Sequence, residues 1–371
     1  MLIAKGANPA RDPVALRKSL RRSPHILPLL LRHGAKPSRL DLGFACEGLD
    51  ETRAAGLFLQ HGADAYLGEP SAPYLAIAAT FHGAGTMRLL LRHGAVVNDM
   101  TWKGLTALEA ACVSWPEWRN DNMEIVQLLL SGGAAVNRQE GHSIALTNAC
   151  SDGNIAISRM LLEHGAAVNR AAEGGGTPLY AACRNFGGHG CDIDLLWLLL
   201  EHGADPNGRG ARWGTPLQAL CGSCEYREVD NTALVKGCAL LLTRGADPTV
   251  CVEGSPYGSA LHAACYHGLV SVVELLLRHG ADVNAPGGSA TPLQQACASR
   301  AASTRRASDI KRLVEMLLDH GAVPSAPAGK HGSALEAARK HNPSVVPLLV
   351  RHGAVLSEAV GREVSDTGNG E

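Results

Sequence analysis

Histidine is the residue whose repetition along this chain could most readily support chemistry. Eight of the 16 histidines stand in the phrase His-Gly-Ala directly after an aliphatic run: His33, His61, His93, His164, His202, His279, His320 and His352. A row of imidazoles could bind metal ions, but one histidine per stacked helix would lie about 10 Å from the next, too far to share an ion. Imidazole can instead contact the exposed carbonyl groups at a helix C-terminus. The pattern therefore predicts structural histidines and no metal site.

Cysteine also recurs at a fixed position. Seven of the 11 cysteines follow the leucine of a predicted first helix by four residues, which places both side chains on one helix face: Cys46, Cys112, Cys150, Cys183, Cys221, Cys265 and Cys297. A free thiol in such a position behaves as a small buried apolar group. Cys183, His189 and Cys191 are close in sequence but lack a fourth ligand, and Cys221 of the one Cys-x-x-Cys segment, 221–224, is itself an inward residue. We expect core thiols without metal.

Motifs for catalysis and cofactor binding are weak. Residues 141–145, Gly-His-Ser-Ile-Ala, superficially resemble a nucleophile elbow but lack the buried strand that must precede one. Residues 208–214 have the wrong glycine spacing for a dinucleotide-binding turn. The sequence contains no P-loop, no His-Glu-x-x-His and no kinase motif set. We expect no enzyme activity, no cofactor and no small-molecule substrate.

The elements that carry these residues repeat along the chain. A Gly-Ala pair after an aliphatic run returns every 28 to 42 residues, a period typical of stacked supersecondary units; its glycines are Gly6, Gly34, Gly62, Gly94, Gly133, Gly165, Gly203, Gly245, Gly280, Gly321 and Gly353. In residues 256–285, apolar spacing predicts one helix that opens at 259–265 and a second through 272–277. Glycine can end the second helix in the left-handed conformation, and an extended, turning finger follows.

A second motif opens the first helix of several units, although alanine replaces its proline at Ala107, Ala145, Ala260 and Ala334. Thr-Pro-Leu begins at Thr177, Thr215 and Thr291, and combines a capping hydroxyl with proline at the first helical position. Thr-Pro-Leu-x-x-Ala, followed later in the unit by Leu-Leu-Leu-x-x-Gly-Ala-x-Val-Asn, resembles the ankyrin repeat. The resemblance implies an all-α fold: an ankyrin-repeat solenoid of helix-turn-helix units with short β-hairpin-like fingers.

The resemblance also implies how the chain is divided. We expect an ankyrin array over residues 1–355, with a partial repeat at 1–8 and full repeats at about 9–36, 37–64, 65–97, 98–136, 137–168, 169–206, 207–248, 249–283, 284–324 and 325–355. Residues 356–371 are a polar C-terminal tail that we expect to be disordered. The start in mid-phrase at Leu2 suggests a fragment of a longer protein. The longest spacings predict inter-helix loops at 114–122, 184–192, 222–236 and 298–309.

Composition limits the partners. Lys+Arg 34 against Asp+Glu 35 gives a net charge of −1, which provides no general attraction for nucleic acid or anionic lipid. The local clusters Arg17-Lys18 with Arg21-Arg22, and Arg305-Arg306, fit a solvated helix face and a loop. No apolar run reaches the ~18 residues that span a bilayer, and no signal peptide opens the chain. We expect an intracellular protein, cytoplasmic or nuclear.

Because ankyrin arrays bind proteins through finger tips and exposed positions of first helices, the resemblance places function there. The tip residues are Trp102, Lys103, Arg138, Gln139, Arg170, Arg209, Arg212, Trp213, Tyr257 and Lys330. Tryptophan, tyrosine and arginine often anchor interfaces. We expect a monomeric, non-catalytic scaffold that binds a protein partner through its concave surface. The alternative is a sensing or substrate-recruiting arm of a larger, nucleotide-hydrolysing or otherwise enzymatic protein whose N-terminal part is missing.

One modification site is also predicted. Residues 305–308, Arg-Arg-Ala-Ser, match the substrate pattern of basophilic kinases. Ser308 is expected to cap a helix that begins at Asp309, where a phosphate would be favoured. An ordinary arginine-rich loop is the alternative interpretation.

Overall fold

The structure is a computed structural model of the 371-residue chain. It describes residues 15–46, 52–65, 73–81, 83–101, 104–113, 122–138, 144–172, 175–186, 193–210, 214–223, 231–252, 254–287, 290–299, 307–326 and 332–355. The predicted partial repeat at 1–8 and the predicted tail at 356–371 lie outside these residues.

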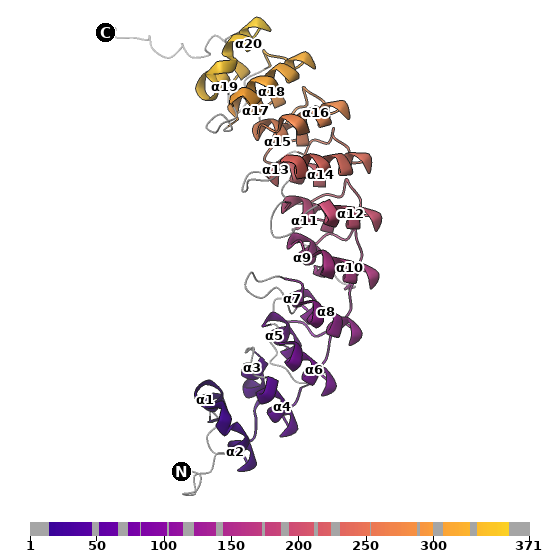
Figure 1. Cartoon of the computed structure of the whole chain (residues 1–371), viewed down its shortest axis with the longest axis vertical. Coiled ribbons are helices and arrows are strands. Elements are labelled where there is room, and N and C mark those ends of the chain that lie inside the picture. Colours follow the sequence, from indigo (N-terminus) through magenta and orange to yellow (C-terminus); the bar gives the residue numbers. More distant parts are fainter. Residues whose placement is uncertain are drawn as a thin grey trace, which may run out of the picture. The chain divides into compact units, whose positions relative to one another are not determined.

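Helices follow one another in pairs along the chain (Figure 1). The pairs are α1 (Ala15–Arg22) with α2 (Leu27–Arg32), α3 (Arg39–Cys46) with α4 (Thr52–Gln60), α5 (Tyr74–Thr80) with α6 (Ala84–Arg92), α7 (Ala107–Ala111) with α8 (Asn122–Ser131), α9 (Ala145–Ser151) with α10 (Ile155–Glu163), α11 (Pro178–Arg184) with α12 (Ile193–Glu201), α13 (Pro216–Gly222) with α14 (Asn231–Thr243), α15 (Ala260–Tyr266) with α16 (Val270–Arg278), α17 (Pro292–Ala298) with α18 (Ala307–Asp319), and α19 (Ala334–His341) with α20 (Val346–Arg351). Short 3-10 turns, η3 (Pro24–Ile26) and η6 (Pro343–Val345), precede α2 and α20. Across the described ranges, no helix is both long and apolar enough to traverse a bilayer.

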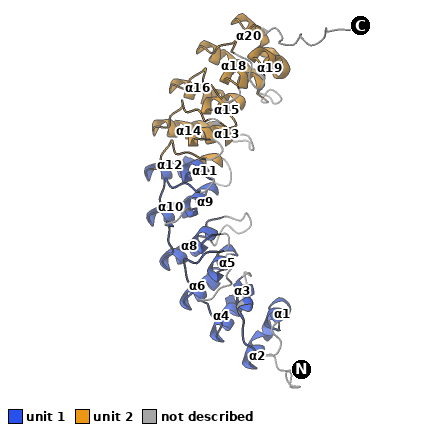
Figure 2. Cartoon of the chain, turned by 180° about the vertical axis from the view of Figure 1, so that it is seen from behind, with its two compact units in different colours: residues 1–182, 189–203 blue, residues 183–188, 204–371 orange. Residues whose placement is uncertain are grey.

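The chain divides into two compact units (Figure 2). Unit 1 comprises residues 1–182 and 189–203, and unit 2 comprises 183–188 and 204–371. In unit 1, the first helices α1, α3, α5, α7 and α9 pack successively in one row, and the second helices α4, α6, α8, α10 and α12 form another. In unit 2, the rows are α13, α15, α17 and α19, and α14, α16 and α18. Each unit is thus a two-layered helical stack, which confirms the all-α expectation.

Side-chain caps explain where several first helices begin. The Thr215 hydroxyl accepts a hydrogen bond from the Gln218 backbone N–H at 3.3 Å, and Gln218 Oε1 accepts one from the Thr215 N–H at 2.7 Å. The same reciprocal capping box opens α7 at Thr106, α17 at Thr291 and α19 at Ser333. These bonds satisfy backbone N–H groups that have no partner inside the helix. The predicted capping role of this position is confirmed here.

The Gly-Ala pair ends second helices as predicted. Gly94 has a φ of +83°, its N–H donates to the Leu91 carbonyl at 3.1 Å, and the Ala95 N–H donates to the Leu90 carbonyl at 3.0 Å. This is the Schellman arrangement, in which a residue without Cβ takes the left-handed conformation and the last carbonyls are satisfied. The same pair of bonds occurs at Gly34, Gly62, Gly133, Gly165, Gly245, Gly280, Gly321 and Gly353.

Leucine, alanine and cysteine fill the core between the two rows. On the first helices, Leu217 and Leu261 are fully buried, and so are Cys221 and Cys265, which follow them by four residues. All seven cysteines at this position are buried, as predicted. Because a single helix pair cannot enclose its apolar faces, burial of these side chains between neighbours favours stacking.

Two of the predicted inter-helix loops end earlier than expected. The second helix α14 starts at Asn231, so Lys236 is helical, and α18 starts at Ala307, so Ser308 lies in its first turn and does not cap a helix at Asp309. In α14, Leu234 begins a stripe of fully buried side chains with Cys238 and Leu241. This apolar period reaches further toward the N-terminus than the repeat motif does, and the helix follows it.

Candidate functional site

Most of the repeated histidines contact a helix end. In α16, His279 Nδ1 lies 2.9 Å from the carbonyl oxygen of Leu275. His61, His164, His202, His320 and His352 make the same contact with the carbonyl four residues back, at 2.8 to 2.9 Å. The predicted structural role is confirmed for these six. Within the described part of the chain, no group of three or more His, Cys, Asp or Glu side chains could hold a metal ion; His189 and Cys191 lie outside it.

Burial makes the inward thiols unreactive. It raises the pKa of Cys297 to about 12, and it raises the pKa values of Cys112 and Cys265 well above the ordinary cysteine range. The thiolate form is the nucleophile and the metal ligand. These cysteines are therefore packed as apolar groups and are poorly suited to redox or metal chemistry.

The fingers are short turns that connect a second helix to the next first helix. Isolated antiparallel bridges join Met100 with Thr106, Ala172 with Gly176, Gly210 with Gly214, and Gly287 with Ala290. These bridges confirm the hairpin-like fingers at four places.

Asparagines attach finger bases to the next repeat. Asn98 Nδ2 donates to the Gly133 carbonyl at 3.2 Å, and its Oδ1 accepts a hydrogen bond from the Ala135 N–H at 2.8 Å. Asn137, Asn207 and Asn284 make the same pair of bonds one repeat further along. The acceptor carbonyls belong to the glycines that end second helices. Each of these asparagines therefore fixes a finger relative to its neighbour.

A buried polar side chain in the first helix holds the following finger from the other side. Gln218 is the third residue of α13, and its Nε2 donates to the Val250 carbonyl at 3.1 Å and to the Gly258 carbonyl at 2.6 Å. Those carbonyls lie in the finger that leads to α15. Since Gln218 Oε1 is also the capping partner of Thr215, one side chain both starts a helix and positions a finger.

His262 occupies the equivalent position in α15. Its Nδ1 lies 2.7 Å from the Ser259 hydroxyl, and a Cβ at Gly287 would lie 2.1 Å from its Nε2. The close approach means that the next finger requires glycine at 287. Burial lowers the pKa of His262 to about 4, although backbone hydrogen bonds at Ala290 and Ala285 oppose the shift. The imidazole is therefore neutral at physiological pH.

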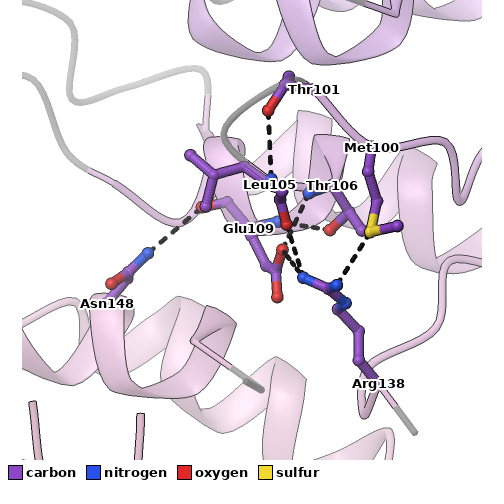
Figure 3. A network of polar contacts seen from close by, with 8 residues as sticks. Met100, Thr101, Leu105, Thr106, Glu109, Arg138 and Asn148 are labelled. Carbon is purple, nitrogen blue, oxygen red and sulfur yellow. Dashed lines mark hydrogen bonds and ion pairs between the residues drawn. The ribbon is translucent and has the colours of Figure 1, made fainter. Parts of the chain in front are cut away.

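Arg138, a predicted contact residue, is engaged inside the molecule (Figure 3). Its Nη1 donates to the Gly104 carbonyl at 2.6 Å and lies 3.5 Å from Glu109 Oε2, while Nη2 contacts Met100 Sδ at 2.9 Å. Glu109 is only 3% exposed, and its carboxylate also accepts the Thr106 N–H. Arg138 therefore compensates a buried charge and ties its own finger to the preceding one.

Tyr257 also packs within the chain. Its ring centroid lies 5.3 Å from that of Tyr266 and 5.3 Å from that of His267, with a tilted and an edge-on geometry respectively. Burial lowers the pKa of His267 to about 4. The three rings support one another, because such offset arrangements of aromatic rings are attractive. Tyr257 is partly exposed, so its ring can present only part of its surface to a partner.

The other predicted contact residues fall into two groups. Arg209 is exposed on the finger that leads to α13, and Arg170 is half-buried on the finger that leads to α11. Trp102, Lys103, Gln139, Arg212, Trp213 and Lys330 lie outside the described residues. Among the predicted tip residues that the structure describes, Arg209 is therefore the most exposed to solvent.

First helices contribute less surface than the sequence suggests. Every side chain of α13 and α17 is buried, and in α15 only Tyr266 is partly exposed. Neighbouring first helices and the overlying fingers cover them. Around α13, α15 and α17, the accessible surface on this side therefore consists mainly of the fingers.

Ser308 is exposed in the first turn of α18. Lys311 and Arg312 follow it by three and four residues, which places them next to Ser308 on the helix surface. Arg305 and Arg306 lie outside the described residues.

Sequence reasoning missed the first-helix residues that contact the next finger, namely Glu109, Gln218 and His262. They share one position, three residues after the capping Thr or Ser. Their identities differ between repeats, so no repeated letter reveals the role. The capping-box spacing was the available signal, since it singles out that third residue.

Paired helices, Gly-Ala ends and hairpin fingers define a helical repeat protein. A family model for "Ankyrin repeats (3 copies)" matches residues 117–209 and 229–327, just over half of the chain. The chain therefore belongs to the ankyrin-repeat family. A crystal structure of the human ASB11 ankyrin repeat domain matches 76% of this chain and 99% of its own, with 23% sequence identity and a TM-score of 0.45. A search of curated proteins finds no match. Ankyrin repeats are generally protein-interaction modules, and ankyrin domains are typically non-enzymatic.

Proposed function

We propose that this chain is a non-catalytic scaffold that binds a protein partner through its fingers and the adjoining first-helix surface. The observation that carries the proposal is the double fixation of the fingers. In the finger that leads to α15, Asn207 Oδ1 accepts a hydrogen bond from the Asp247 N–H at the base, and Gln218 donates to the Val250 and Gly258 carbonyls. Two side chains of the preceding repeat therefore leave this turn little freedom.

Fixed fingers suit recognition because they lose little conformational entropy when a partner binds them. Arg209 presents a planar, multiply hydrogen-bonding group from such a finger, and arginine is common among residues that dominate interface energies. Burial raises the pKa values of the Cys112, Cys265 and Cys297 thiols, which disfavours these three side chains as nucleophiles. These features favour a binding surface over a catalytic pocket.

Affinity purification from the native cell, followed by mass spectrometry, supplies the partner for the test. Arg170→Ala and Arg209→Ala remove finger side chains, while Arg159→Ala on α10 and Lys236→Ala on α14 remove exposed charges from second helices. We expect the combined finger variant to weaken partner binding about tenfold or more, as loss of an interface arginine commonly does. The second-helix variant should bind like the parent. The reverse pattern would contradict the proposed surface.

We propose that the scaffold acts as a monomer and that its partner is a protein. We also propose that it works in a reducing compartment, either the cytoplasm or the nucleus. Cys112, Cys221, Cys265 and Cys297 are buried free thiols, which supports a compartment where disulfides are rare. Sedimentation of the purified chain tests whether it is a monomer in solution. The alternative role, a recruiting arm of a larger enzyme, is tested by the intact mass of the native polypeptide in the same purification.

A further inference from the structure

The N-terminal end of unit 1 carries a concentration of positive charge. Residues 15–46 contain seven Lys or Arg and a single acidic residue, Asp41, although the whole chain has a net charge of −1. Four of these cations lie on the eight-residue helix α1: Arg17, Lys18, Arg21 and Arg22. Leu16 and Leu20 bury the opposite side of that helix.

Asp41 does not offset this exposed charge. Its carboxylate is 1% exposed, and Oδ1 lies 3.4 Å from Arg17 Nε. Its Oδ2 accepts hydrogen bonds from the Ser38 N–H at 2.8 Å and from the Ser38 hydroxyl at 2.5 Å. Within residues 15–46, the one acid is therefore buried against Arg17 and Ser38. Lys18, Arg21 and Arg22 are exposed.

An aromatic ring positions two of the guanidinium groups. The guanidinium carbons of Arg17 and Arg21 lie 5.8 and 5.1 Å from the centroid of the Phe44 ring in α3. Contacts of this kind attract the cation and limit its rotamers while its N–H edge stays available.

We propose that the cationic face of α1, formed by Lys18, Arg21 and Arg22 beside Arg17 and Phe44, binds an acidic segment of a protein partner. The inference rests on the proposed scaffold function and adds the chemistry of what is bound. Guanidinium groups match carboxylates in bidentate geometry, and arginine clusters are a recurring means of recognising acidic motifs. An eight-residue helix is about 12 Å long, which suits a short run of Asp or Glu better than a membrane surface. Since two cations already cover Phe44, its ring is poorly placed to stack on a base.

The test uses the full chain and a fluorescent poly-glutamate peptide, with a poly-glutamine peptide of equal length as the neutral probe. The α1 variant is Lys18→Glu, Arg21→Glu, Arg22→Glu. The matched control is Arg53→Glu, Arg92→Glu, Arg159→Glu, which changes the charge equally at exposed second-helix positions of the same unit. Circular dichroism and thermal midpoints show whether both variants remain folded.

We expect the parent to bind poly-glutamate but not poly-glutamine, with affinity that decreases as salt increases. The α1 variant should lose about tenfold or more in affinity, and the control less than about threefold. Equal losses in both variants, or no binding to poly-glutamate, would overturn the proposal. So would tighter binding to oligothymidylate or to phosphatidylserine-containing vesicles. If the natural partner is still captured through the fingers in that event, only the α1 proposal fails and the scaffold function stands.

Discussion

The third residue of a first helix shows how one side chain can serve two structural purposes. Glu109 and Gln218 both cap their own helix, but Gln218 donates directly to the next finger whereas Glu109, as an acceptor, requires Arg138. The carboxylate and the amide have the same size and differ in charge and donor capacity. Arg138 is thus explained by the identity of residue 109, which makes the pair testable by exchange.

We predict that Arg138→Met lowers the unfolding free energy of unit 1 by about 2 kcal/mol, because it leaves the buried Glu109 carboxylate without its counterion. Adding Glu109→Gln should restore most of the loss, since glutamine already serves at position 218. Thermal and urea unfolding of both variants provides the measurement. A loss that Glu109→Gln fails to reduce would show that the ion pair is not the reason for the effect.

We also predict a pH dependence from His262. Its pKa of about 4 in the folded state lies below the ordinary value of 6.5. Between these values the unfolded chain binds the extra proton, so stability falls as pH decreases from about 6.5 to about 4 and is fully present above 6.5. The contribution is at most ~3 kcal/mol. His262→Gln keeps a capping side chain that does not titrate, and should reduce the pH dependence of the unfolding midpoint over this range without abolishing it, because His267 has a similarly lowered pKa. An unchanged slope would contradict the assignment.

At the scale of elements, the same three kinds of hydrogen-bonded contact recur along the chain. Capping boxes start first helices, Gly-Ala ends second helices, and asparagines fasten finger bases one repeat ahead. The first two could be predicted because they are local patterns with fixed spacing. The starts of α14 and α18 could not be placed, because each lies within an insertion where buried spacing, not the motif, sets the boundary. The finger contacts were also missed, because Arg138 and Glu109 are 29 residues apart.

We predict that Asn284→Ala loosens the joint between the finger after α16 and the end of α18. The substitution removes the bond from Nδ2 to the Gly321 carbonyl and frees the Val323 N–H. Two lost hydrogen bonds correspond to about 1–3 kcal/mol. Hydrogen exchange should accelerate at Val323, whereas Ser271→Ala, an exposed change on α16, should leave it unaffected. Unchanged exchange at Val323 would mean that the asparagine does not fix the joint.

Ser308 gives a second prediction at this scale. A basophilic kinase with Mg-ATP should place one phosphate on Ser308, because its hydroxyl is exposed and Arg305 and Arg306 precede it. The phosphate at the N-terminus of α18, near Arg312, should stabilise this helix by up to ~1 kcal/mol. Ser271 is also exposed and also second in its helix but lacks the arginines, so it is the matched control. Phosphate on Ser271 to an equal degree, or none on Ser308, would contradict the site.

At the scale of the whole molecule, membership of the ankyrin-repeat family could be predicted from the sequence, because the Gly-Ala phrase after an aliphatic run recurs along it. The described fingers and the cationic α1 lie outside that phrase, where the residues differ from one repeat to the next. The division into ten full repeats and the contact roles of Trp102 and Trp213 stay predictions, because their tests lie in binding experiments. Repeats specify the stack through local signals, but the chemistry of recognition depends on residues that differ from one repeat to the next.

The central claim is that a protein partner binds the fingers and the first-helix side. The most direct measurement is hydrogen exchange of the full chain with and without the partner captured from its native cell. We predict protection in the finger segments 166–172 and 204–210, and in α1 if the partner carries an acidic segment, with little change in α10, α14 and α16. Protection confined to those second helices, with the fingers unchanged, would contradict the account.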